Sequence, residues 1–197
     1  MTKVLGLTGG IATGKSTVSK YLAQKGAVII DGDLIARRVV EPHQLGLKRL
    51  VKVFGPQILA SDGTLQRAKL GKMVFGDVKA EAKLNQTLGS IIHQEICMDL
   101  KKARANQVKL VVLDIPLLFE GGYEKLCEAV MVVAVKPATQ LKRLIDRNHY
   151  DEATAEARIN AQWPLERKKE LATVVIDNEA SIENTYLQVD NWLFNWL

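Results

Sequence analysis

The segment Gly9 to Ser16 reads Gly-Gly-Ile-Ala-Thr-Gly-Lys-Ser and fits the phosphate-binding loop pattern G-x-x-x-x-G-K-[ST]. Its glycines let the backbone curl so that successive N–H groups face one centre, where they bind the β-phosphate of a nucleoside triphosphate. Lys15 adds a positive charge for the β- and γ-phosphates, and Ser16 offers a hydroxyl to Mg²⁺. The loop follows an apolar run, Val4 to Leu7, and this context favours a nucleotide site over an ordinary strand-to-helix turn.

A second group of polar residues, Asp31-Gly32-Asp33-Leu34-Ile35-Ala36-Arg37, follows the apolar run Ala27 to Ile30. Ligands bind at the carboxyl ends of strands in open α/β sheets, so Asp31 and Asp33 are candidates for the acceptor side. If a helix begins here, Asp33 and Arg37 share a face, which sets a potential proton acceptor beside an anion-binding group. A helix N-cap with an i,i+4 ion pair fits the same spacing.

Short aliphatic runs with helical stretches between them predict the elements that position these residues. Their unbroken apolarity is typical of a parallel sheet that is buried on both faces. Asp114 stands at the end of the third run, where an aspartate can hold Mg²⁺ through water. The five predicted strands are Val4–Leu7, Ala27–Ile30, Leu110–Leu113, Val130–Val135 and Thr173–Ile176.

Two stretches are longer than a simple crossover between parallel strands requires. The first, about Arg37 to Asn106, reads as several helices and predicts a helical subdomain, with breaks at Pro42, Gly55-Pro56 and Asp62-Gly63. The second, Pro137 to Leu171, is called the lid segment below, because an arginine-rich helical segment at the phosphate side can close over a nucleotide. The resulting parts are 1–36, 107–136 and 172–197 for the nucleotide core, 37–106 for the helical insertion and 137–171 for the lid segment.

Arg143 and Arg147 are four residues apart in the lid segment. On one helix face two like charges repel unless an anion lies between them, and a transferring phosphate supplies that anion. Two solvated arginines paired with neighbours such as Asp146 fit the spacing equally well. At the end of the chain, Tyr186, Val189, Leu193 and Trp196 recur at helical spacing and predict a closing helix on the core, with Trp192 and Trp196 as core residues.

The composition is that of an ordinary globular protein: 197 residues, 47% hydrophobic, with a net charge of +5. The basic excess suits a binder of polyanionic small molecules or a merely basic surface, and no basic run indicates nucleic-acid binding. Cys97 and Cys127 lie far apart and predict buried free thiols in a reducing compartment. No apolar segment approaches membrane-spanning length, so we expect a cytoplasmic protein without a membrane anchor.

Taken together, the motifs closely resemble the dephospho-coenzyme A kinase family, and the resemblance runs through nearly the whole chain. Its most specific parts are the phosphate loop with Leu7-Thr8, the Asp31-x-Asp33-x-x-Ala36-Arg37 segment and Asp114-x-Pro116-Leu117-Leu118-Phe119-Glu120. Further similar segments are Gln140-Leu141-x-Arg143-Leu144-x-x-Arg147, Ala157-Arg158-Ile159-x-x-Gln162, Val175-Ile176-Asp177-Asn178, Asp62-Gly63-x-Leu65-x-Arg67 and Ile92-His93.

The resemblance implies a P-loop kinase fold of class α/β, with a helical substrate domain and a lid, and ATP-dependent phosphorylation of the ribose 3′-hydroxyl of dephospho-coenzyme A. The partners would be dephospho-coenzyme A, ATP and Mg²⁺, with a monomer or weak homo-oligomer and no nucleic acid or membrane. The catalytic residues would be Asp33, Lys15 and Arg143. ATP would bind Gly9, Gly10, Ile11, Ala12, Thr13, Gly14, Lys15, Ser16, Thr17, Arg143 and Arg147. The substrate would bind Thr8, Asp31, Asp33, Arg37, Arg67, His93 and Leu117, and the metal Ser16 and Asp114.

Three features depart from the family pattern or from a simple reading of it. Ala12-Thr13 stands where the family usually has Gly-Ser, and a positive φ at Ala12 would be strained. Gln94 follows His93 where a proline is usual, and Glu179-Ala180 replaces a common polar-glycine pair. A lone histidine beside Ile92 is more often a packed or capping residue than a ligand.

Two other classes of protein share the phosphate loop. Another small-molecule or nucleotide kinase of the P-loop superfamily would have the same loop and lid, but it would not be expected to carry the Asp31-x-Asp33 and Pro116 to Glu120 segments. A GTP-dependent switch would usually carry Asn-Lys-x-Asp and an Asp-x-x-Gly after the third strand, and this chain has neither. A kinase for dephospho-coenzyme A is therefore the favoured interpretation.

Overall fold

The computed structural model describes residues 1–74 and 76–197, which form two compact units. Unit 1 contains Met1–Ile30 and Lys102–Leu197, and unit 2 contains Asp31–Lys101. The division lies close to the ends of the expected helical insertion at 37–106. The functional roles of the parts stay predictions.

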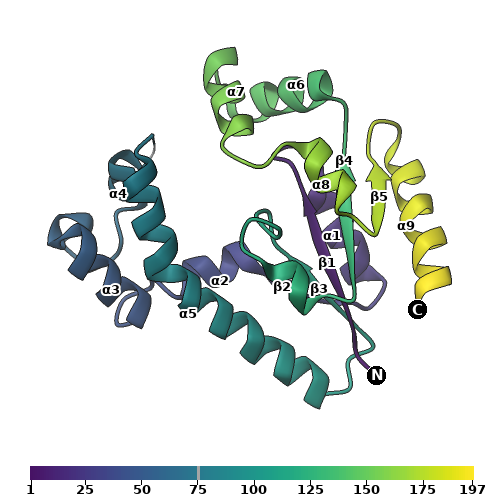
Figure 1. Ribbon diagram of the computed structural model, residues 1–197, viewed down its shortest axis with the longest axis horizontal. Helices are drawn as coiled ribbons and strands as arrows, with labels where there is room; N and C mark the ends of the chain where they lie inside the picture. Colours follow the sequence, from purple (N-terminus) through teal and green to yellow (C-terminus); the bar gives the residue numbers. More distant parts are fainter. Residues whose placement is uncertain (75) are drawn as a thin grey trace. The chain divides into compact units, whose positions relative to one another are not determined.

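A five-stranded parallel sheet in the order β2-β3-β1-β4-β5 forms the frame of the nucleotide core (Figure 1). β1 pairs in parallel with both β3 and β4, and β4 pairs in parallel with β5. Each strand lies within one or two residues of its prediction, because each is an aliphatic run flanked by polar residues. The strands are β1 (Lys3–Gly9), β2 (Val28–Asp31), β3 (Leu110–Asp114), β4 (Ala129–Ala134) and β5 (Val174–Asp177).

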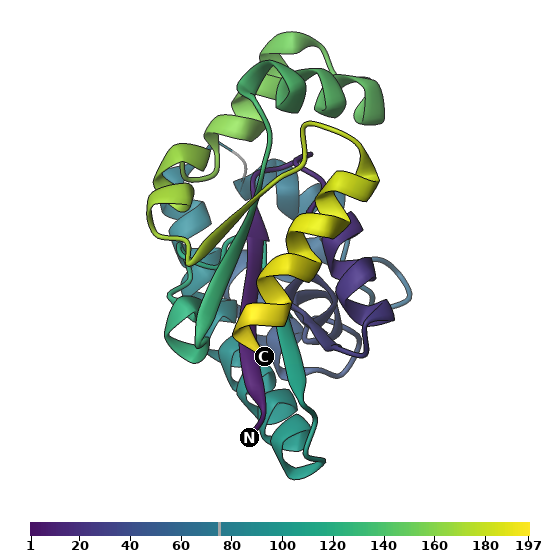
Figure 2. The ribbon, with the colours of Figure 1, turned by 90° about the vertical axis from the view of Figure 1, so that its right-hand side faces the viewer.

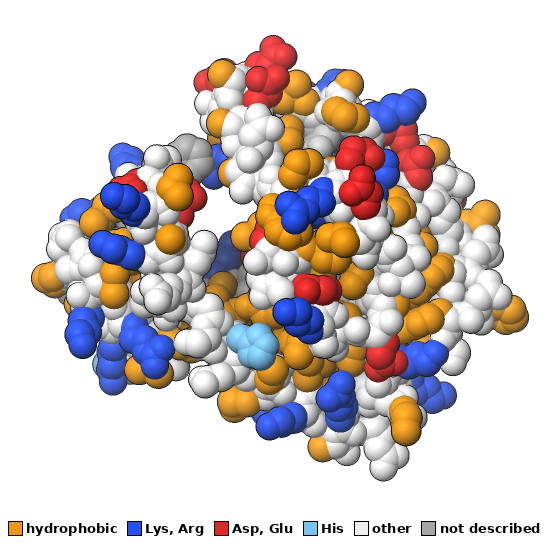
Figure 3. All heavy atoms as spheres, viewed as in Figure 1, with side chains coloured by type: hydrophobic (Ala, Val, Ile, Leu, Met, Phe, Trp, Pro, Cys, Tyr) orange, Lys and Arg blue, Asp and Glu red, His pale blue; other side chains and the backbone are white. Residues whose placement is uncertain are grey.

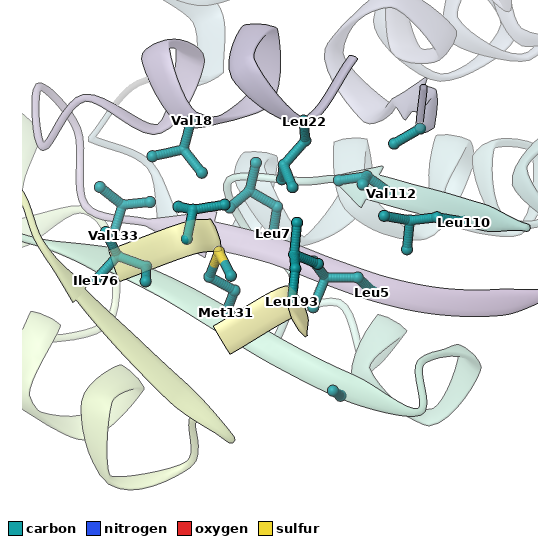
Figure 4. Packing of buried hydrophobic residues seen from close by; sticks show 13 residues of the cluster. Leu5, Leu7, Val18, Leu22, Leu110, Val112, Met131, Val133, Ile176 and Leu193 are labelled. Carbon is teal, nitrogen blue, oxygen red and sulfur yellow. The ribbon is translucent and has the colours of Figure 1, made fainter. Parts of the chain in front are cut away.

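One face of the sheet packs against α1 (Lys15–Gln24) and α9 (Ile182–Trp196), as Figures 2 and 4 show. Alternate residues of the strands point to this side, and Leu5 and Leu7 are fully buried there between α1 and α9. In α1 the inward residues are Val18 and Leu22, which lie one turn apart. Burying each such side chain contributes about 1.5–3 kcal/mol. The opposite face is equally apolar, with Val4, Val111, Leu113, Val130 and Val132 buried.

The C-terminal helix α9 confirms the predicted closing helix. Trp192 and Trp196 are partly buried against the core and stack on each other with ring centroids 4.8 Å apart. Tyr186 stacks on Tyr21 of α1 at 3.8 Å, and the Tyr21 hydroxyl donates to Asp190 at 2.6 Å. The two tryptophans are therefore packing residues, as expected.

The lid segment folds into α6 (Pro137–Asn148), α7 (Glu152–Asn160) and α8 (Leu165–Glu170), all within unit 1 (Figure 1). Pro137 sits in the first turn of α6, where its missing N–H leaves no bond unmade. His149 ends α6 in the left-handed conformation with φ 55°. Asp151 caps α7 by accepting the N–H of Thr154 at 2.7 Å.

Unit 2 is helical, as predicted. Its elements are α2 (Gly32–Arg38), α3 (Leu45–Phe54), the short 3₁₀ helix η1 (Pro56–Ile58), α4 (Arg67–Val74) and most of α5 (Val78–Ala105); the second 3₁₀ helix, η2 (Tyr123–Leu126), belongs to unit 1. α3 ends at Gly55, whose φ of 84° suits glycine, and Pro56 then begins η1. Arg38 ties α2 to α5 through Glu95 at 2.9 Å and Asp99 at 3.1 Å.

The surface of unit 2 that Figure 3 shows carries lysine and arginine side chains among apolar and uncharged ones, without a continuous basic run. Within residues 1–74 and 76–197, no helix combines the length and the apolarity needed to cross a bilayer. Both cysteines are free and half-buried. Burial and the nearby Glu124 and Glu128 raise the pKa of the Cys127 thiol to about 12, so this thiol stays protonated near neutral pH.

Candidate phosphate-transfer site

The phosphate loop joins the end of β1 at Gly9 to the start of α1 at Lys15. Gly14 has φ 95° and Ala12 has φ 63°, so two loop residues adopt the left-handed region. For alanine this conformation costs about 1–2 kcal/mol relative to the right-handed one. The strain anticipated at Ala12 is therefore present, because the loop keeps its curl although a methyl group stands where the family usually has glycine.

Side chains from outside the loop hold the Ile11 peptide groups. The Ile11 N–H donates to Gln162 Oε1 at 3.0 Å, and Gln140 Nε2 donates to the Ile11 carbonyl at 2.9 Å. Gln140 belongs to α6 and Gln162 follows α7, so both bonds join the loop to the lid segment. Gln140 is 5% exposed, which shows that its amide is an internal contact.

Asn178, directly after β5, holds the next turn of the loop. Its Nδ2 donates to the Thr13 carbonyl at 2.8 Å, and its Oδ1 accepts the Thr185 hydroxyl at 2.8 Å. Thr13 is itself fully buried and turns back on the loop, because its hydroxyl donates to the Gly10 carbonyl at 2.9 Å. These contacts fix the backbone just before α1.

Lys15 and Asp114 form an ion pair at the sheet edge. Parallel pairing sets Leu7 of β1 beside Asp114 of β3, and the following Ile115 N–H donates to the Leu7 carbonyl at 3.0 Å. Asp114 is 5% exposed, so its carboxylate needs a positive partner, which the first residue of α1 supplies.

The donor atoms of Ser16 and Asp114 fit a Mg²⁺ ion. Both are hard oxygen ligands, and Mg²⁺ is usually held by one or two carboxylates together with waters and substrate phosphates. Ser16 is exposed in the first turn of α1. Over the described part of the chain, no group of three or more histidine, cysteine or acidic side chains gathers at a potential metal site.

The two lid arginines behave differently. An Arg143 guanidinium nitrogen donates to the Asn178 carbonyl at 3.0 Å, so Arg143 is half-buried beside the residue that braces the loop. Arg147 is exposed and donates to Asn148 at 2.8 Å. Asp146, the expected alternative partner, forms its ion pair with Lys142 at 3.1 Å.

The segment after β3 is held by a buried cation. Lys168 of α8 has no exposed surface, and its Nζ donates to the Pro116 carbonyl at 2.9 Å and contacts Glu120 Oε1 at 2.8 Å. The Thr8 hydroxyl donates to the same Pro116 carbonyl at 2.9 Å. Leu117, the next residue, is 44% exposed and thus accessible to a ligand.

The other acceptor candidates lie in unit 2. Asp31 caps α2, because its Oδ1 accepts the N–H groups of Asp33 at 2.8 Å and Leu34 at 3.0 Å, so the N-cap reading of this segment is correct for Asp31. Asp33 is exposed in the first turn of α2. An Arg67 guanidinium nitrogen donates to the Arg37 carbonyl at 3.3 Å, which brings these two residues together.

His93 is exposed on α5, where its Nδ1 lies 3.6 Å from Cys97 Sγ. The structure thus gives this histidine a helix-surface position one turn from a thiol. Its role in substrate binding stays a prediction.

Sequence reasoning assigned no role to the residues that support the site. Gln140, Gln162 and Asn178 stood inside the family-like motifs, so the signal was present, but their partners lie more than a hundred residues away in the chain. Lys168 is buried, although nothing in the local sequence sets it apart from its basic neighbours in the lid segment. Glu120 was noted only as part of the segment after β3.

Comparison with known proteins agrees with this geometry. The family model described as "Dephospho-CoA kinase" matches residues 3–184. A dephospho-CoA kinase of Enterococcus faecalis is 45% identical over 193 residues, covering 98% of this chain and 96% of the relative. One from Lactobacillus johnsonii is 47% identical over 182 residues, with 92% of each chain covered.

Solved structures point the same way. The structure of TT1252 from Thermus thermophilus has a TM-score of 0.82 and 29% identity, covering 100% of this chain and 98% of that one. The dephospho-CoA kinase from Campylobacter jejuni has a TM-score of 0.74 and 26% identity, covering 99% and 97%. These similarities confirm the predicted α/β fold with its parallel sheet.

The buried ion pair between Lys168 and Glu120 generates a prediction about stability. Lys168→Met should lower the free energy of unfolding by about 3–5 kcal/mol, because the Glu120 carboxylate loses its cation. Adding Glu120→Gln should recover part of this loss, since no unpaired buried charge remains. Urea unfolding followed by circular dichroism measures both, with Lys169→Met on the same helix as the control. Equal stability of Lys168→Met and the control would contradict the prediction.

Proposed function

This chain belongs to the dephospho-coenzyme A kinase family, and it is therefore a kinase that uses ATP to phosphorylate the ribose 3′-hydroxyl of dephospho-coenzyme A. We propose that the residues described above carry out this transfer. The observation that supports the assignment best is the Lys15–Asp114 pair beside the curled loop. This pair brings the Lys15 ammonium and the Asp114 carboxylate, a candidate Mg²⁺ ligand, together at one edge of the sheet. The product of the phosphorylation is coenzyme A, so the reaction is the last step of coenzyme A synthesis.

The loop from Gly9 to Thr17 binds the ATP phosphates. Its backbone N–H groups and the N-terminus of α1 receive the β-phosphate, and no acidic residue lies in the first turn of that helix. When ATP enters, the Lys15 ammonium moves from Asp114 to the β- and γ-phosphate oxygens. Ser16 and Asp114 would hold Mg²⁺, and the bound ion would neutralise phosphate charge.

The acceptor side is formed by Thr8, Asp31, Asp33, Arg37, Arg67, His93 and Leu117. Asp33 orients the 3′-hydroxyl and takes its proton as the oxygen attacks the γ-phosphorus, and ADP departs. Asp33 needs no raised pKa, because in a loose transition state the hydroxyl proton leaves late. Arg37 and Arg67, which are hydrogen-bonded to each other, offer charge to the phosphates of the substrate.

Arg143 and Arg147 act from the lid segment, on the transferring phosphate. Arg143 has the more favourable position, because its bond to the Asn178 carbonyl holds it beside the loop. We assign the lid role to 137–171, the substrate role to 37–106 and the nucleotide core to the rest. A cytoplasmic monomer or weak homo-oligomer is part of the same proposal.

The acceptor can be tested directly. Purified protein with Mg·ATP and dephospho-coenzyme A should give a product heavier by one phosphate, located on the ribose 3′ position by NMR. Shikimate, gluconate and nucleosides serve as competing acceptors. Preference for any of these over dephospho-coenzyme A would favour the alternative of another P-loop kinase. Removal of Mg²⁺ by a chelator should abolish turnover.

Asp33→Asn tests the proton acceptor. Turnover should fall by about 10²–10⁴-fold, because an amide cannot take the hydroxyl proton. The dissociation constant for ATP should change little, since Asp33 is assigned to the acceptor. Isothermal titration and steady-state kinetics measure these, and Glu41→Gln, an exposed change of similar charge, is the control. Near-normal turnover of a folded Asp33→Asn protein would refute the assignment.

Arg143→Ala tests the lid arginine. Loss of a donor to developing charge should lower kcat by about 10²–10³-fold, with a much smaller effect on ATP binding. Arg143→Lys should recover only part of the rate, because lysine lacks the planar fork of arginine. Lys142→Ala, at the exposed neighbouring position, is the matched control. An equal loss of kcat and ATP affinity would instead indicate a contact made in the ground state.

A further inference from the structure

The bonds that reach the loop from outside carry a further role. We infer that the side-chain amides of Gln140 and Asn178 are positioning residues for catalysis: they hold two loop carbonyls outward, so that the N–H groups of the same peptides face the phosphates. The inference deepens the proposed function and rests on its assignment of the loop to ATP.

In a trans peptide the C=O and the N–H point in opposite directions. The described chain contains no cis peptide bonds. Gln140 Nε2 donates to the Ile11 carbonyl at 2.9 Å and so fixes the direction of this carbonyl. The N–H of the same peptide, which belongs to Ala12, therefore points away from Gln140 and toward the inside of the curl.

The same geometry holds two peptides further on, at the peptide that joins Thr13 to Gly14. Asn178 Nδ2 donates to the Thr13 carbonyl at 2.8 Å, so the Gly14 N–H points away from Asn178. The Thr185 hydroxyl donates to Asn178 Oδ1 at 2.8 Å, and this bond decides which end of the amide faces the loop. Asn178 is only 8% exposed, so water does not compete freely for its donor.

The Thr13 N–H, between those of Ala12 and Gly14, donates to the Gly10 carbonyl at 3.3 Å, and the preceding Ile11 N–H is directed outward. It donates to Gln162 Oε1 at 3.0 Å and is not available to a phosphate in this arrangement. The loop therefore sorts its donors: the N–H groups of Ala12 and Gly14 are left for the ligand, whereas that of Ile11 is used for support. This sorting distinguishes a built cradle from a merely flexible glycine turn.

The close approach of the two amides also accounts for two glycines. A Cβ atom on Gly14 would lie 2.0 Å from Asn178 Nδ2, and one on Gly10 would lie 2.5 Å from Gln140 Nε2. Atoms cannot approach so closely, so any side chain here would displace the brace. The glycines thus serve the contact with Gln140 and Asn178 as well as the curl of the loop.

Ala12 lies between the two braced carbonyls and has φ 63°, a conformation that alanine rarely adopts. Strained residues persist when their surroundings over-determine them. Here the Ile11 carbonyl, which precedes Ala12, and the Thr13 carbonyl, one residue beyond it, are both held. Removing either amide releases the strained segment, and the N–H groups then lose their common direction.

The test uses Gln140→Met and Asn178→Leu, which keep the approximate shape of each side chain and remove its donor. Each variant should weaken ATP binding about tenfold or more, the change expected for a misdirected hydrogen bond to a charged group. KM for dephospho-coenzyme A should change much less. Gln188→Met is the matched control, because Gln188 braces the Asp177 backbone in the same way but does not touch the loop.

A spectroscopic measurement separates positioning from general stability. In ¹⁵N-labelled wild-type protein, ADP should shift the amide signals of Ala12 and Gly14 strongly downfield, and the signal of Ile11 weakly. In Gln140→Met the Ala12 shift should shrink, and in Asn178→Leu the Gly14 shift should shrink, each leaving the other largely intact. Thermal unfolding establishes that the variants are folded.

The outcomes are distinguishable. If ADP shifts none of the loop amides in the wild-type protein, the assignment of the loop to ATP is wrong. If the wild-type shifts occur and both variants bind ATP as the control does, the positioning role is wrong. Should Asn178→Leu fail to fold, Gln140→Met and the shortened Gln140→Asn decide the same question at the Ile11 carbonyl, where normal ATP affinity in both would overturn the inference.

Discussion

A backbone that binds phosphate through its N–H groups must place its carbonyls elsewhere, and this requirement governs the structure around residues 9–16. Buried carbonyls need donors, because an unsatisfied polar group costs about 1–3 kcal/mol. The chain supplies them from three separate places: Gln140 in α6, Asn178 after β5 and the Thr13 hydroxyl within the loop. Side chains from the lid segment and from the end of the sheet thereby fix the orientations of the same few loop peptides.

A second support acts on the neighbouring strand. Lys168 carries the only fully buried ammonium group among the described residues, and it fixes the Pro116 carbonyl two residues beyond Asp114. Glu120 accepts both this cation and the Trp163 N–H at 3.1 Å, so the end of the lid segment is joined to the segment after β3. The Lys168–Glu120 pair consequently holds both the segment that follows the predicted metal ligand Asp114 and the predicted lid.

Much of the frame could be predicted from the sequence, because its signals are local. Aliphatic runs predicted all five strands, and the helical spacing of Tyr186, Val189, Leu193 and Trp196 predicted the closing helix α9. The supports could not be predicted, since a glutamine or a lysine shows its partner only once distant segments meet. Lys168 illustrates this: among the seven lysine and arginine residues of the lid segment, nothing local marks the one that is buried.

The two braces Gln140 and Asn178 are carboxamides, and neither gains or loses a proton in the pH range of living cells. A carboxylate in either place would add a negative charge beside the phosphates, and an ammonium would compete with Lys15 for them. Neutral dipoles are also screened by dissolved salt far less than exposed ion pairs are. The conformation of the proposed phosphate-binding loop should therefore depend little on pH and ionic strength. The charged groups proposed to act on the nucleotide, such as Lys15, remain free to move toward it.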